Sequence, residues 1–181
     1  VIEILKNYDI KKIITTCPHC FNTFKNEYPD LGGNFEVINY LQFIERSISE
    51  GRLKVNRDKM KGATITFHDP CYLGRANNIY SEPRDIAKAI SPGFTEMKRN
   101  RSFALCCGAG GAQMFKEAEK GSKEIFIERT GEALETGADI IATACPFCMT
   151  MMTDGLKYAN REEDVRNLDI AELVAEAMEI M

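Results

Sequence analysis

The stretch IITTCPHC, residues 13–20, returns almost unchanged as IATACPFC at residues 141–148. Each copy joins a short run of β-branched and apolar residues to a CPxC motif, and a segment with helical periodicity follows. The same offset, without a gap, aligns Val37 with Val165 and Asn39 with Asn167. We therefore interpret the chain as two copies of one strand-to-helix unit.

Strands and helices are predicted to alternate along the whole chain. The predicted strands are residues 13–16, 35–39, 63–67, 94–97, 139–143 and 165–168. The predicted helices are residues 21–28, 41–49, 83–90, 113–135, 147–156 and 170–178. Strands separated by crossover helices predict an α/β fold with parallel sheets and flanking helices. In such folds ligands bind where strands end and helices begin, and most of the cysteines lie there.

The composition excludes several classes of protein. The chain has 181 residues, 44% of them hydrophobic, and a formal net charge of -4, which indicates a folded protein without a nucleic-acid-binding surface. No apolar run approaches the roughly 18 residues that a membrane-spanning helix needs, so we expect a cytoplasmic chain. Val1 stands inside an amphipathic run, and we expect this chain to be a fragment of a longer polypeptide.

The seven cysteines are grouped rather than scattered, and their odd number favours metal or redox chemistry over a disulfide framework. Cys71 follows the predicted strand 63–67, and Cys145 and Cys148 follow the predicted strand 139–143. Cys106 and Cys107 precede a glycine-rich turn. The groups are separated by intervals long enough for one crossover each. We therefore expect five thiols, those of Cys71, Cys106, Cys107, Cys145 and Cys148, to converge at one edge of a sheet.

Five converging thiolates favour an iron–sulfur cluster. Structural zinc takes four ligands, usually as two close pairs, so a fifth cysteine would be surplus and adjacent cysteines would be an awkward pair. A multi-iron cluster accepts thiolates from several directions. Gly108, Gly110 and Gly111 let backbone N–H groups come close to a bound cluster, which makes them candidate cofactor-binding residues. Zinc in a structural module is the alternative.

Three motifs, HDPC (68–71), CCGAGG (106–111) and CPFC (145–148), resemble the CCG domain. This is the cysteine-rich domain of the heterodisulfide reductases and of related iron–sulfur oxidoreductases, including the iron–sulfur subunit of glycolate oxidase. The resemblance implies a [4Fe-4S] cluster, of a noncubane type where all five thiolates are used. The implied ligands are Cys71, Cys106, Cys107, Cys145 and Cys148.

The resemblance also implies a domain organisation, because members of this family usually carry two CCG units in tandem. Residues 1–60 then correspond to the C-terminal part of a first unit, and residues 61–181 to a complete second unit. Cys17 and Cys20 are the implied metal ligands of a second cluster site that is incomplete in this chain. One position departs from the family, in which CCGAGG commonly continues with glycine and arginine: here Ala112 and Gln113 follow.

By resemblance, the activity is that of an oxidoreductase in disulfide–thiol or hydroxy-acid metabolism. The implied partners are a ferredoxin-like or flavoprotein electron carrier and a small-molecule substrate, and the parent protein is expected to be membrane-associated through other segments. An electron-relay or docking module without a substrate of its own is the alternative. For Cys17 and Cys20, the alternative is a CPxC dithiol.

Three polar side chains near Cys71 each have two interpretations. His68 is the candidate catalytic residue, as a proton donor or a partner beside the cluster, and the alternative is that it fixes the turn before Asp69. Tyr72 and Arg75 would position an anionic substrate or cover the site. In the alternative, Tyr72 is a core residue and Arg75 is an exposed side chain.

Overall fold

The computed structural model describes residues 1–117 and 120–178. Its helices are α1 (Ile2–Asn7), α2 (Pro18–Asn22), α3 (Tyr40–Ser49), α4 (Ser81–Ile90), α5 (Ile125–Glu135), α6 (Pro146–Tyr158) and α7 (Ile170–Ala177). Its strands are β1 (Lys12–Thr15), β2 (Glu36–Asn39), β3 (Thr64–Phe67), β4 (Gly93–Thr95), β5 (Ile140–Thr143) and β6 (Arg166–Asp169). Among the described residues, no helix is both long and apolar enough to cross a bilayer.

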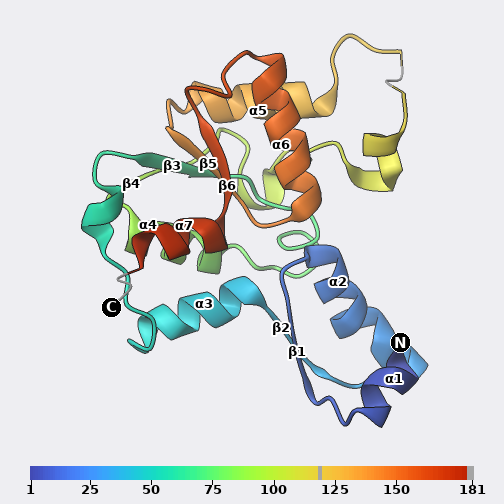
Figure 1. Ribbon diagram of the computed structural model, residues 1–181. Coiled ribbons are helices and arrows are strands. Elements are labelled where there is room, and N and C mark those ends of the chain that lie inside the picture. Colours follow the sequence, from blue (N-terminus) through green and yellow to red (C-terminus); the bar gives the residue numbers. More distant parts are fainter. Residues whose placement is uncertain (118–119, 179–181) are drawn as a thin grey trace.

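The centre of the molecule is a parallel sheet of four strands in the order β4-β3-β5-β6. Helices α4 and α7 lie on one face of this sheet and α5 and α6 on the other (Figure 1). Because side chains alternate along a strand, Ile140 and Ala142 pack into the core that includes α4 and α7, whereas Ile141 packs under α5 and α6. The predicted α/β architecture is confirmed.

The order of the strands creates a binding position at the carboxyl edge of the sheet. From β3 the chain crosses outward to β4, and from β5 it crosses in the opposite direction to β6. The crevice outside the carboxyl ends of two such strands is where open α/β sheets bind ligands. In this chain that crevice lies between the segments that follow β3 and β5, which contain Cys71 and Cys145.

Residues 1–60 contribute a second, smaller sheet, the parallel pair of β1 and β2. Helix α3 packs against α4, and its Tyr40 and Leu41 belong to the same hydrophobic core as Ile65 and Phe67 of β3. The Tyr40 hydroxyl also donates to the carboxylate of Asp169, at 2.8 Å from each oxygen. One hydrophobic core therefore contains side chains from both sides of residue 60. The division of the chain into two family units stays a prediction.

The pairing of the strands corrects one part of the internal alignment. Thr15 pairs with Asn39 in the small sheet, and Thr143 pairs with Asp169 in the large one. Asn39 and Asp169 each cap the following helix with a capping box. The structural counterpart of Asn39 is therefore Asp169, and the gapless alignment with Asn167 is wrong by two residues. The reason is that the connection containing α6 is longer by two residues than the one that follows β1.

The predicted long helix 113–135 is also wrong, because only α5 (Ile125–Glu135) is an α-helix. Residues 110–115 form a 3-10 helix in which Gly111 and Ala112 have φ values of 64° and 62°. Two consecutive left-handed residues cannot continue an α-helix. Residues 118 and 119, which the prediction included, lie outside the described residues. The predicted helix 21–28 is α2 followed by a π-helix, Thr23–Glu27.

Candidate metal centre

Five cysteine side chains meet at the carboxyl edge of the large sheet. Cys71 lies in the turn after β3, and Cys106 and Cys107 lie in the loop that follows β4 and a 3-10 helix, Arg101–Phe103. Cys145 is the N-cap residue of α6, and Cys148 is in its first turn. All five line one cavity of about 280 Å³. The predicted convergence of these thiols is found in the structure.

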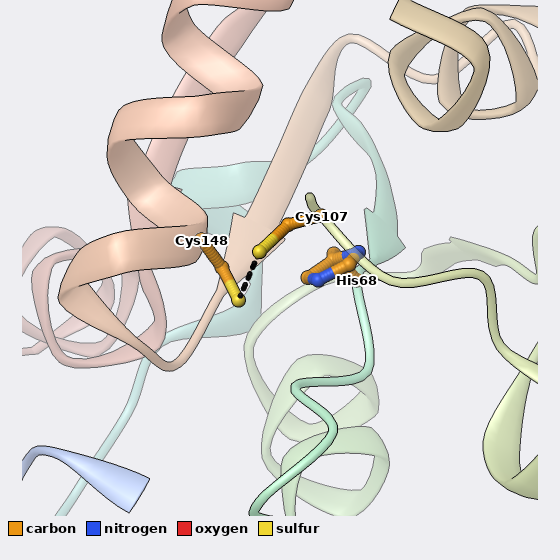
Figure 2. Close-up of side chains that lie close together, drawn as sticks. All are labelled: His68, Cys107 and Cys148. Atoms are coloured by element: carbon orange, nitrogen blue, oxygen red, sulfur yellow. Dashed lines mark hydrogen bonds between the residues drawn. The ribbon is translucent and has the colours of Figure 1, made fainter. Parts of the chain in front are cut away.

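The five sulfurs lie close enough together to influence one another. The sulfur of Cys148 lies 3.3 Å from that of Cys107, and the two side chains point toward each other (Figure 2). The thiols of Cys106 and Cys107, of Cys71 and Cys106, and of Cys145 and Cys148 shift one another's pKa, so they are neighbours as well. All seven cysteines of the chain are free thiols in the structure. The side chains therefore present an array of sulfur donors.

The thiols differ in acidity along this array. Hydrogen bonds from Cys107 and Cys71 hold the pKa of Cys106 well below its usual range, and a bond from Cys148 lowers the pKa of Cys145 to about 7. The donating thiols are affected in the opposite sense. The bond to Cys106 raises the pKa of Cys107 to about 11 and also raises that of Cys71, and the contact with Cys107 raises that of Cys148. Cys106 and Cys145 are therefore the most acidic thiols of this array.

Backbone N–H groups point at these sulfurs from the glycine-rich turn and from the start of α6. The Gly108 amide donates to the Cys106 sulfur at 3.3 Å, and the Ala109 amide acts to lower the pKa of Cys107. The amides of Phe147 and Cys148, at the start of α6, act to lower the pKa of the Cys145 thiol. Such donors favour negative charge on sulfur.

The three predicted glycines contribute in different ways to this turn. Gly108 and Gly111 have positive φ, 92° and 64°, whereas Gly110 does not. Gly110 and Gly111 line the cavity. A side chain at Gly108 would be strained by its backbone conformation and would contact α5. That these glycines bind a cofactor stays a prediction.

The donor set fits a multi-iron cluster better than a single ion. Within the described residues, one group of ligands is compact enough to share one ion, and it consists of His68, Cys107 and Cys148, with ligand atoms within 4.8 Å of one another. Structural zinc needs four ligands. The remaining thiols, those of Cys71, Cys106 and Cys145, line the same cavity outside that compact group. Thiolates at several positions around a cavity are what an iron–sulfur cluster requires.

His68 lies immediately after β3, fully buried beside two of these sulfurs (Figure 2). Its backbone amide donates to the Ala142 carbonyl at 2.9 Å, so the strand pairing continues to this residue. The Nδ1 atom of its ring accepts a hydrogen bond from Nε of Arg129 at 2.9 Å, and Nε2 is buried without a partner among the described residues. Burial and the charge of Arg129 lower the pKa of His68 to about 3, so the ring is neutral.

Asp69 holds the HDPC turn through buried charges. Its two carboxylate oxygens accept from Arg84 of α4 at 2.8 and 2.9 Å, and one of them also accepts from the Arg101 amide at 2.8 Å. Arg84 binds Glu96 on its other side, at 2.7 and 2.8 Å. This network joins the turn that carries Cys71 to the loop that leads to Cys106.

The wall of the cavity includes aromatic side chains from both parts of the chain. His19, from the first CPxC motif, lies with its ring centre 4.3 Å from that of Tyr72 and 5.3 Å from that of Phe147. All three side chains line the cavity. Tyr72 is 41% exposed, so its alternative interpretation as a core residue is wrong. Arg75 is exposed and donates to the Ala104 carbonyl at 2.7 Å.

Cys17 and Cys20 form a separate pair at the N-terminus of α2. Cys20 is exposed and Cys17 is half-buried, and neither of these described residues lines the cavity. The Cys17 sulfur lies 3.8 Å from Nδ1 of His19. Partial desolvation and the neighbouring Cys17 raise the pKa of Cys20. The structure therefore keeps this pair outside the cavity that the other five cysteines line.

Sequence reasoning missed two of the residues that shape the site. Arg129 stands between Glu128 and Glu132 in an amphipathic helix, a pattern typical of an exposed helix face. His19 corresponds to Phe147 in the internal alignment, and this equivalence was the available signal that the two CPxC motifs present similar surfaces.

Comparisons with known proteins agree with this geometry. The family described as the cysteine-rich domain (CCG) matches residues 65–153. The chain is 41% identical over 184 residues to an EtfAB:quinone oxidoreductase of Syntrophomonas wolfei and 43% identical over 180 residues to the probable iron-sulfur-binding oxidoreductase FadF of Bacillus subtilis. These alignments cover 98% of this chain and 26% and 25% of the two relatives.

A third relative comes from Methanosarcina barkeri. The chain is 38% identical over 186 residues to a subunit of its dihydromethanophenazine:CoB--CoM heterodisulfide reductase, and the alignment covers 98% of this chain and 43% of that relative. The chain thus spans about a quarter of the length of the first two relatives and less than half of the third.

Proposed function

We propose that this chain, which through residues 65–153 belongs to the family of cysteine-rich CCG domains, is the cluster-binding part of an iron–sulfur oxidoreductase. In this proposal a [4Fe-4S] cluster is bound by Cys71, Cys106, Cys107, Cys145 and Cys148. The observation that supports the proposal is that all five cysteines line one cavity, in which the sulfurs of Cys107 and Cys148 lie 3.3 Å apart.

When bound, the cluster supplies the ability to accept and release single electrons. The residues of the chain bind it and control its surroundings. The amides of Gly108, Ala109, Phe147 and Cys148 stabilise negative charge on the sulfurs, and the aromatic wall limits access of water. The cavity provides space beside the sulfurs for a small molecule.

The named relatives support electron transfer as the activity of the whole protein. One is called a quinone oxidoreductase and another belongs to a heterodisulfide reductase. We propose that this chain exchanges electrons with a ferredoxin-like or flavoprotein partner and passes them to a disulfide, a quinone or a hydroxy-acid couple. In the parent protein this would occur at the cytoplasmic face of a membrane.

Residues 1–60 are proposed to be the C-terminal part of a first CCG unit. The support is that β1 and β2 pair as β5 and β6 do, with a CPxC motif after the first strand and a capping box after the second. Cys17 and Cys20 would then hold part of a second cluster together with ligands from outside this chain. The division at residue 60 is part of this proposal.

The test is anaerobic reconstitution with iron and sulfide, followed by metal analysis and electron paramagnetic resonance. We expect about four irons and a matching amount of acid-labile sulfide per chain. Replacing Cys107 by serine should reduce or change the signal, and replacing Cys20 by serine, the matched control, should leave it unchanged. Stoichiometric zinc without labile sulfide in the anaerobically isolated protein would contradict the proposal.

A further inference from the structure

The buried pair of His68 and Arg129 has no role in the function proposed so far. His68 follows β3, and Arg129 lies on α5, so the two side chains meet across the carboxyl edge of the sheet. Arg129 is fully buried and is itself held in place, with Nη1 donating to the Arg99 carbonyl at 2.7 Å and to Glu132 at 2.8 Å. Its Nε donates to Nδ1 of His68 at 2.9 Å.

This hydrogen bond determines which nitrogen of His68 carries the proton. A guanidinium group has donors and no acceptor, so Nδ1 must offer its lone pair to Arg129. In a neutral imidazole the other nitrogen is then protonated. Nε2 of His68 is therefore an N–H donor, and it is buried with no acceptor among the described residues.

The same bond decides between two roles for His68 near the sulfurs. One ring nitrogen of His68 lies within 4.8 Å of the sulfurs of Cys107 and Cys148, which by distance alone would suit a metal ligand (Figure 2). A ligating histidine needs a lone pair toward the metal and normally donates its other N–H to an acceptor. Arg129 offers a donor at that second position, so the arrangement is the reverse of a ligating histidine.

We propose that Arg129 fixes His68 as an Nε2–H donor toward the sulfurs of Cys107 and Cys148, so that His68 is a positioning residue of the cluster site and not a metal ligand. This proposal rests on the cluster site proposed above. An N–H dipole directed at cysteine sulfur stabilises the more negative, reduced state of a cluster. The expected effect of His68 is therefore to raise the reduction potential.

The first test uses the metal-free, reduced protein and does not depend on cluster formation. The chain has two histidines, so nitrogen-15 labelling of histidine gives two sets of ring signals, and replacing His19 by leucine assigns them. We expect the shifts of His68 to show a protonated Nε2 and an unprotonated Nδ1. A protonated Nδ1 would overturn the proposal, whether or not iron binds.

The second test uses the reconstituted protein. Replacing His68 by leucine removes the donor and should make the one-electron reduction about tenfold less favourable. This corresponds to a reduction potential that is lower by about 59 mV. Replacing His68 by glutamine keeps an N–H donor in a similar place and should restore most of the potential. Equal potentials in the leucine variant and the native protein, or a strong hyperfine coupling from a directly bound histidine nitrogen-15, would overturn the proposal.

The two tests separate failure of this inference from failure of the proposed function. A native protein that shows the Nε2–H form and binds no iron contradicts the cluster site and leaves the tautomer established. A native protein that binds about four irons and shows the Nδ1–H form contradicts only the role of Arg129 and His68.

Discussion

Replacing Gly155 by alanine should separate the two helices that cover one face of the sheet. Gly155 lies in α6 against Thr130 of α5, and a Cβ atom added there would be 2.0 Å from Oγ1 and 2.7 Å from Cβ of Thr130. Ordinary contacts of a Cβ atom are 3.4–4 Å. Because Thr130 Cβ is anchored to the backbone, the helices must move apart or distort.

The magnitude follows from two opposing effects. Alanine is favoured over glycine in a helix by about 1 kcal/mol. Overpacking a close helix contact lowers the free energy of unfolding by about 1–3 kcal/mol. We expect a value at the upper end of this range, because the added methyl group meets Cβ of Thr130. We expect the free energy of unfolding to fall by about 2 kcal/mol, which lowers the melting temperature by about 4–8 °C in a chain of this size.

Gly131 provides the matched control for this prediction. It lies in α5, and an added Cβ atom would meet nothing within 4 Å. Its replacement by alanine should raise the free energy of unfolding by about 1 kcal/mol. Since both variants share the helix-propensity gain, the difference between them, about 3 kcal/mol, measures the packing cost at Gly155 alone.

Urea unfolding of the metal-free, reduced protein, followed by circular dichroism, measures both variants. Combining alanine at Gly155 with alanine at Thr130 should recover part of the loss, because Oγ1 and Cγ2 of Thr130 are then absent. Equal stability of the Gly155 and Gly131 alanine variants would refute the reasoning that α5 and α6 approach each other too closely for a methyl group.

Three further changes test other parts of the structure by the same unfolding measurement. Replacing Arg84 by methionine leaves the buried carboxylate of Asp69 unpaired and should cost about 3–5 kcal/mol, and a loss below about 1 kcal/mol would contradict that role. Ala112 has a φ of 62°, so replacing it by glycine should raise the free energy of unfolding by about 0.5 kcal/mol. Relief of about 1–2 kcal/mol of backbone strain is partly offset by the greater entropy of glycine in the unfolded chain. A lower free energy of unfolding would argue against the left-handed turn. Replacing Tyr40 by phenylalanine removes the bond to Asp169 and should cost about 1–2 kcal/mol, while unchanged stability would show that this bond does not hold α3 in place.

The elements that sequence reasoning placed correctly are those with a strong local pattern. The apolar runs that precede each CPxC motif are strands, and the CPxC motifs start helices, because proline suits the first turn of a helix. The meeting of the five thiols could be predicted from the spacing of cysteines between strand ends, since the carboxyl ends of parallel strands lie at one edge.

The parts that could not be predicted depend on contacts between distant residues. Arg129 is flanked by acidic residues in a helical pattern that normally faces water, and only the packing of α5 on the sheet buries it against His68. The helix predicted over 113–135 failed because the left-handed backbone at Ala112 has no signature in that residue type.

The contact of His19 with Tyr72 and Phe147 has a consequence for how such a protein can be divided. A wall of the cavity is supplied by a residue from the segment before residue 60, while the five thiols all follow it. A gene that kept only the later segment would encode every thiol of this cavity and leave the cavity open to solvent at that wall. If the two segments were carried on different polypeptides, the shorter one would complete this wall by placing its imidazole against the rings of Tyr72 and Phe147.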